Sequence, residues 1–279
     1  MLLIIDDAIE YFIDSMPKVP FSREDVIVEF FTLDNAIERY VSLCQQYFPR
    51  KLDRKDYLNG ELFEDAAAMA LVGKEKVGML FRSDLQDSAT DFRHGVLHEL
   101  AHIYCLLREM PRDEHFIDIY LGCTPETDFL TAEERQEDGI LSAGYAIWCE
   151  FIADYIAVLL DAEGFEHDFR SGASYMSEML NGLGIGIPTS KRAMSNFLVT
   201  IMTCSDVNKA IGKVGSLVNA SIRPMLKQIV EMVYEHITLP VVGEWGADAA
   251  SKCPWRIDRD FIRDLGYNYL ALLARMMFV

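Results

Sequence analysis

The sequence has few basic residues and no segment that would direct a chain to a membrane. Lysine and arginine number 26 against 44 aspartates and glutamates, so the formal net charge is -18. This charge repels phosphate backbones and anionic lipids, which excludes nucleic acids and membrane surfaces as expected partners. Residues 1–16 have no basic stretch, and no run approaches the roughly 18 apolar residues of a membrane span. A neutral or basic polypeptide is the favoured partner, although solubility alone also explains the acidity.

The sequence also lacks paired cysteines, internal repeats and low-complexity linkers. None of its six cysteines forms a Cys-x-x-Cys pair, and their spacing is irregular. In a chain of 279 residues, 51% of them hydrophobic, these cysteines are expected to be reduced and mostly buried. We therefore expect a cytoplasmic protein with a substantial hydrophobic core.

Strand patterns come early and helical patterns follow. Residues 25–33 are β-branched and aromatic, which predicts a strand, and residues 33–48 have the apolar spacing of a helix. Two short apolar runs at 68–72 and 77–81, separated by Gly-Lys-Glu-Lys, predict a β-hairpin. This order predicts an α+β fold with a small antiparallel sheet.

Two further helices are predicted, from about 90 to 109 and from 143 to about 164. Between them, an acidic segment with two prolines and a glycine predicts a partly irregular insertion at about 106–140. We expect residues 1–165 to form the core domain and residues 166–279 to form a mostly helical C-terminal region of unknown role. The helices predicted in that region span about 170–182, 189–203, 205–235 and 257–276.

The first of these two helices carries the sequence Gly-Val-Leu-His-Glu-Leu-Ala-His-Ile-Tyr, residues 95–104. His98 and His102 are four residues apart, so on a helix both imidazoles share one face and can bind one ion. Zinc suits two neutral imidazoles, and Glu99 beside them can act on a water molecule as a general base. The alternative is a surface helix with two histidines. The otherwise uncharged surroundings favour burial, and buried histidines need a partner such as a metal.

The second helix supplies carboxylates at the same spacing. Glu150 and Asp154 share one face, and the small residues Ala146, Ala153 and Ala157 let two helices approach closely. We expect Glu150 to be the third zinc ligand, and Asp154 to accept a hydrogen bond from the far nitrogen of a ligand histidine, His98 being favoured. A surface role for both carboxylates is the competing explanation.

These two segments resemble the gluzincin metallopeptidases, and most closely the ImmA/IrrE family. The resemblance rests on residues 91–104 and on the Glu-x-x-Ala-x-x-x-Ala-x-x-Leu pattern that begins at Glu150. It implies a zincin-like core, zinc as cofactor and a cytosolic enzyme of bacterial or phage-related origin that cleaves a specific protein in a regulated way. The interval from His102 to Glu150 is longer than is usual in that family.

Several further points stay open. A substrate strand is expected to pair with the edge of the hairpin at 68–81. His94, one turn before His98, is too far from His102 to share its ion and is expected to line the cleft or pack in the core. Cys105 and Cys149 are expected to be core residues. An additional donor for the oxyanion has five candidates: His115, Tyr145, Tyr155, His167 and His236.

Three functions compete. The first is a zinc endopeptidase with a narrow protein substrate, favoured because an intact Glu99 has no purpose in a binding module. The second is a non-catalytic interaction or sensor protein with a zincin fold, because the insertion and the large C-terminal region have room to cover the cleft. The third is a metal-free helical protein with a chance motif.

Overall fold

The computed structural model describes residues 2–48, 63, 67–85, 89–108, 131–161 and 259–276. Within these ranges, five long helices accompany one small sheet, which agrees with the predicted α+β class. The elements are α1 (Leu2–Ser15), β1 (Val26–Phe31), α2 (Ala36–Tyr47), β2 (Ala68–Val72), β3 (Val77–Arg82), α5 (Ala89–Leu107), α7 (Ala132–Leu160) and α13 (Arg259–Met276). The insertion at 109–130, the helices predicted between 170 and 235, and the residues around them lie outside the described ranges.

The sheet has the strand order β1-β3-β2. β2 and β3 form the predicted antiparallel hairpin, closed by a hydrogen bond from Gly73 N–H to Lys76 O. β1 pairs with β3 in parallel, with Val26 opposite Val77. The prediction of a purely antiparallel sheet is therefore wrong. The chain leaves β1 through α2 and returns, so β3 enters the sheet in the same direction as β1, which requires a crossover rather than a tight turn.

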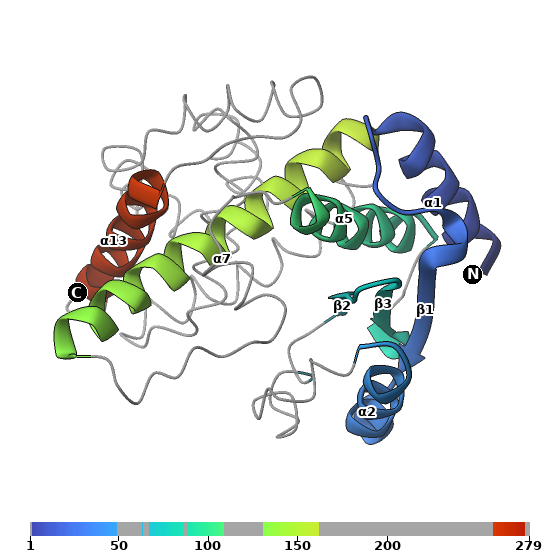
Figure 1. Ribbon diagram of the computed structural model, residues 1–279, viewed down its shortest axis with the longest axis horizontal. Helices are drawn as coiled ribbons and strands as arrows, with labels where there is room; N and C mark the ends of the chain where they lie inside the picture. Colours follow the sequence, from blue (N-terminus) through green and yellow to red (C-terminus); the bar gives the residue numbers. More distant parts are fainter. Residues whose placement is uncertain are drawn as a thin grey trace, which may run out of the picture.

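The two faces of the sheet belong to different hydrophobic clusters. Along β3, Val77, Met79 and Phe81 pack into the larger cluster, which also holds buried side chains of α1, α5, α7 and α13. Leu80 points the other way and packs with Leu71 and the buried face of α2. This alternation follows from the two-residue period of a strand. The sheet is thus covered by α2 on one face and by α5 on the other (Figure 1).

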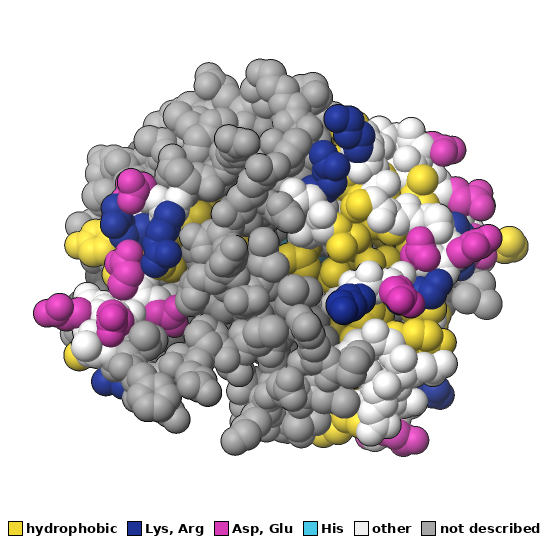
Figure 2. All heavy atoms as spheres, in the orientation of Figure 1, with side chains coloured by type: hydrophobic (Ala, Val, Ile, Leu, Met, Phe, Trp, Pro, Cys, Tyr) yellow, Lys and Arg dark blue, Asp and Glu magenta, His cyan; other side chains and the backbone are white. Residues whose placement is uncertain are grey.

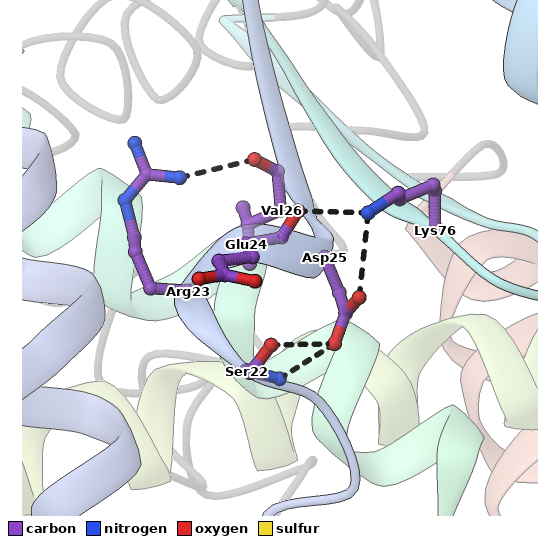
Figure 3. A network of polar contacts seen from close by, with 6 residues as sticks. All are labelled: Ser22, Arg23, Glu24, Asp25, Val26 and Lys76. Atoms are coloured by element: carbon purple, nitrogen blue, oxygen red, sulfur yellow. Dashed lines mark hydrogen bonds and ion pairs between the residues drawn. The ribbon is translucent and has the colours of Figure 1, made fainter.

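A polar network fixes the start of β1 against the β2–β3 turn (Figure 3). The ammonium of Lys76 donates to the carbonyl of Glu24 at 2.8 Å and contacts Asp25 Oδ1 at 3.4 Å. The other carboxylate oxygen of Asp25 accepts from the backbone and hydroxyl of Ser22, at 2.9 and 2.7 Å. These bonds hold the pKa of Asp25 below its usual value. They also connect the two chain segments that flank the parallel pair.

The N-terminal segment forms α1, an element that the sequence analysis did not assign. Its buried residues Ile5, Ala8, Ile9 and Phe12 recur at helical spacing. This apolar spacing would have predicted the helix from the sequence. α1 lies against α5, where the hydroxyl of Tyr104 donates to the carbonyl of Pro17 at 2.9 Å. The N-terminal segment is therefore part of the larger hydrophobic cluster.

α7 begins earlier than predicted. It runs from Ala132 to Leu160, so the last part of the segment predicted as an irregular insertion is helical. The start is fixed by a capping box, in which Thr131 Oγ1 accepts from the Glu134 N–H at 3.2 Å and Glu134 Oε2 accepts from the Thr131 N–H at 2.7 Å. The acidic residues here stabilise the positive N-terminal end of the helix instead of disrupting it.

α13 crosses the first half of α7, away from the sheet (Figure 1). The crossing places Gly144 against Gly266, so that backbone meets backbone. A Cβ added at Gly144 would collide with the carbonyl oxygen of Ile262, and one at Gly266 would collide with the carbonyl oxygen of Ile140. The described part of the C-terminal region therefore shares the larger cluster with α7.

Two features of the structure relate to the expected cytoplasmic location: the charge of the surface and the apolar character of one helix. Figure 2 shows acidic side chains at both ends of one face, over α1 and β1 and over α7 and α13, with basic side chains among them. Among the described helices, α7 is long and apolar enough to cross a membrane, but 56% of its most apolar stretch is buried inside the protein. A core helix of a soluble protein meets the same criteria. α7 by itself thus assigns the chain to neither environment.

Candidate metal centre

His98 and His102 lie one turn apart on α5, the central helix of the larger cluster. Their Nε2 atoms are 3.0 Å apart, and their rings are nearly perpendicular. The two side chains are 17% and 8% exposed. α5 is buried around most of its circumference, with Val96, Leu97 and Ala101 fully inaccessible. The packing of the helix therefore fixes both imidazoles.

Glu150 and Asp154 lie one turn apart on α7 and face the same histidines. The Glu150 carboxylate is 3.5 Å from His98 Nε2 through one oxygen and 3.7 Å from His102 Nε2 through the other. Asp154 contacts the earlier histidine, His98, at 2.7 Å. The earlier residue of α5 thus faces the later residue of α7, so the two helices run antiparallel at this site.

Asp154 Oδ1 is 2.7 Å from His98 Nδ1, the contact expected from the sequence. A carboxylate at this distance keeps a proton on Nδ1, so Nε2 is the nitrogen that faces Glu150 and His102 and that would bind a metal ion after losing its proton. Asp154 therefore orients the ring and sets its tautomer.

The electrostatics of the two imidazoles differ. Burial opposes the charged form of His98, but hydrogen bonds to Asp154 and Glu150 outweigh it and hold its pKa well above the usual value. Burial lowers the pKa of His102 to about 4, with the charge of His98 acting in the same direction and that of Glu150 against it. His102 is thus neutral at pH 7, whereas His98 carries the proton that a cation would displace.

Glu99 lies between the two histidines in sequence and is 8% exposed. Burial raises its pKa to about 7, against the charge of His98 and together with that of Glu150. A carboxyl group with this pKa exchanges a proton readily near neutral pH. It is the buried carboxyl group that the sequence analysis assigned as a general base.

The arrangement of donor atoms fits a tetrahedral metal ion. Ligand atoms from His98, His102 and Glu150 all lie within 4.8 Å of one another. A tetrahedral zinc ion with ligands at about 2.0–2.1 Å separates any two of them by roughly 3.4 Å. The two Nε2 atoms are 3.0 Å apart, and Glu150 approaches His98 through Oε2 at 3.5 Å and His102 through its other oxygen, Oε1, at 3.7 Å. Two imidazoles and one carboxylate are also a donor set typical of catalytic zinc.

The other candidate residues from the sequence analysis are not among the clustered donor atoms or lie outside the described residues. His94 is 3% exposed and is not among the clustered donors. Cys105 and Cys149 are buried free thiols, and burial raises the pKa of Cys149. Tyr145 is buried and stacks on Trp148. Tyr155 is partly buried beside Phe151. His115, His167 and His236 lie outside the described residues.

The sequence analysis missed an ion pair at the end of the same two helices. Arg93 Nη1 is 2.9 Å from Asp161 Oδ2. The signal was present, because antiparallel pairing of His98 with Asp154 places a residue near the start of α5 opposite one near the end of α7. Recognising it required the axial register of the two helices.

Comparison of the chain with protein-family models, with curated proteins and with solved structures found no match. The assignment of this centre therefore rests on its geometry and on the chemistry of its donors.

Proposed function

We propose that this chain is a zinc-dependent peptidase of the zincin type, similar to the ImmA/IrrE family. The observation that carries the proposal is the convergence of two imidazoles and one carboxylate, from separate helices, with one ligand atom from each residue within 4.8 Å of the others. His98, His102 and Glu150 would hold zinc, with the fourth position left for water or substrate.

The chemistry divides between the ion and the protein. Zinc in this position would polarise a substrate carbonyl and make a water molecule more acidic. Glu99 would take the proton of the attacking water. With a pKa of about 7, its carboxylate is a stronger base than an ordinary glutamate and is still partly deprotonated at neutral pH. The same carboxyl group would then deliver the proton to the leaving amine. Asp154 would keep His98 in the ligating tautomer.

The substrate in this proposal is an extended segment of a cytosolic protein. β2 is the outer strand on one side of the described sheet, and α5 lies against it. A substrate segment that pairs with β2 would add a strand and pass beside the helix that carries the two histidines. The acidic net charge disfavours nucleic acid and anionic membrane as partners.

Metal analysis and a peptide library test the proposal. We expect close to one zinc per chain in the wild type, with most of it lost in His98→Ala and Glu150→Ala. Glu99→Gln should keep the zinc, since it removes no ligand, yet lose cleavage of library peptides. Zinc without any cleavage by the wild type would favour the non-catalytic sensor instead. Equal cleavage by wild type and Glu99→Gln would remove Glu99 from the mechanism.

A further inference from the structure

We propose that the Arg93–Asp161 ion pair is a positioning device that sets the axial register of α7 against α5. In this role it holds Glu150 and Asp154 opposite the histidines, although neither member of the pair touches the proposed metal. The inference rests on the proposed zinc centre for its functional meaning, but the register itself exists without metal.

The pair lies beyond the polar contacts that His98 and His102 make with α7, toward the start of α5 and the end of α7. His102 faces Glu150 at 3.7 Å, His98 faces Asp154 at 2.7 Å, and Arg93 faces Asp161 at 2.9 Å. In this order the α5 residues come progressively nearer the start of α5, and the α7 residues come progressively nearer the end of α7. The Arg93–Asp161 contact therefore lies at the end of the helix pair that is away from His102 and Glu150.

The placement of the two charges is unfavourable for each helix alone. Asp161 is the C-terminal cap of α7, where its N–H bonds to the carbonyl of Ala157 and its carboxylate lies at the negative end of the helix dipole. Arg93 lies one turn into α5, near the positive end. Each charge neutralises the other across the helix pair, so the ion pair favours the observed register.

Burial strengthens the contact. The side chain of Asp161 is 10% exposed and that of Arg93 is 32% exposed, so the pair is shielded more than a surface ion pair. Tyr11 of α1 covers it, with its ring centroid 5.0 Å from the Arg93 guanidinium and its hydroxyl donating to the carbonyl of Leu160 at 3.3 Å. Three helices thus meet at this ion pair.

Apolar packing between the helices includes large buried side chains such as Tyr104 on α5 and Trp148 and Phe151 on α7, and small residues lie among them. Ala101 on α5, and Ala153 and Ala157 on α7, are fully buried. At these alanines the backbones can approach closely, and the hydrophobic effect by itself has no preferred direction. A shift by one residue moves a helix by about 1.5 Å, whereas metal–ligand distances tolerate only about 0.2 Å. The Arg93–Asp161 ion pair adds to this packing a charge contact that favours one register and so helps to keep Glu150 within that tolerance.

The test uses the full chain with Arg93→Gln, Asp161→Asn and the exchanged pair Arg93→Asp with Asp161→Arg. The matched control is Arg23→Gln, because Arg23 bonds to Asp6 on α1 and to the carbonyl of Val26 without contacting α7. Two properties are measured. One is the zinc dissociation constant by chelator competition, and the other is the downfield Nδ1–H proton signal of His98 in zinc-free protein, identified by its loss in His98→Ala.

We expect Arg93→Gln and Asp161→Asn each to weaken zinc binding on the order of tenfold and to shift or broaden the His98 signal. The exchanged pair should restore both. Arg23→Gln should lower the melting temperature without changing either property. An unchanged His98 signal in Arg93→Gln, or an equal change in Arg23→Gln, would overturn the inference. A wild type that shows the signal but binds no zinc would instead refute the proposed function and leave the register test intact.

Discussion

Glu99 is a carboxyl group whose burial makes the folded state prefer its protonated form. Its pKa rises from 4.5 to about 7 on folding without metal. Between these pH values the folded state binds a proton that the unfolded state has released, so its contribution to stability is present below pH 4.5 and is lost as pH rises through 7. A pKa that rises from 4.5 to about 7 corresponds to roughly 3 kcal/mol.

Glu99→Gln should therefore remove a pH-dependent penalty. The amide stays neutral at every pH, so we expect the zinc-free variant to gain up to about 3 kcal/mol relative to wild type on going from pH 4 to pH 8. Urea denaturation at both pH values measures this difference. A variant whose stability difference from wild type is the same at both would show that Glu99 is not desolvated in the folded protein.

His98 gives a prediction about protons and metal. In zinc-free protein its pKa is held well above the usual value, while that of His102 is lowered to about 4. At pH 7 zinc would then displace about one proton, from His98. Calorimetric titration in buffers of different ionisation enthalpy measures the number released. Release of no proton would mean that His98 is already neutral before zinc binds.

At the scale of elements, the crossing of α7 and α13 has almost no free volume. Gly144→Ala would force its Cβ against the carbonyl of Ile262, and moving a backbone is costly because helices are rigid. We expect a loss of roughly 3 kcal/mol in the free energy of unfolding, the upper range for overpacking. The melting temperature and urea midpoint measure the loss.

Gly139→Ala is the matched control for that change. Gly139 lies on the same helix, is exposed, and has no atom within 4 Å of an added Cβ. Alanine there should raise stability by about 1 kcal/mol through helix propensity. If both alanine variants are equally stable, the close approach of the two backbones does not hold in solution.

What the sequence predicted about these elements depended on local pattern. The helix at 90–109, the hairpin at 68–81 and the one-turn pairs His98–His102 and Glu150–Asp154 all follow from spacing within one segment. Parallel pairing of β1 with β3 joins distant segments, and nothing local in either strand specifies it. The Arg93–Asp161 contact depends on how far one helix slides along another, which side-chain periodicity does not determine.

At the scale of the whole molecule, charge opposes compactness. With a net charge of -18, acidic side chains repel one another, and this repulsion is stronger in the folded state because the charges are closer together. Raising sodium chloride from 20 to 300 mM should screen it. We expect the melting temperature to rise by about 3 °C, equivalent to roughly 1 kcal/mol. A fall with salt would mean that ion pairs such as Arg93–Asp161 and Lys76–Asp25 contribute more than the repulsion costs.

The parallel pairing of β1 with β3 also has a consequence for the order of folding. The β2–β3 hairpin closes over a short stretch of chain and is able to form early. β1 joins it only after a loop of about fifty residues has closed, which slows folding because distant contacts cost entropy before they contribute energy. During synthesis, β1 and α2 must therefore remain without their sheet until Val77–Arg82 has been made.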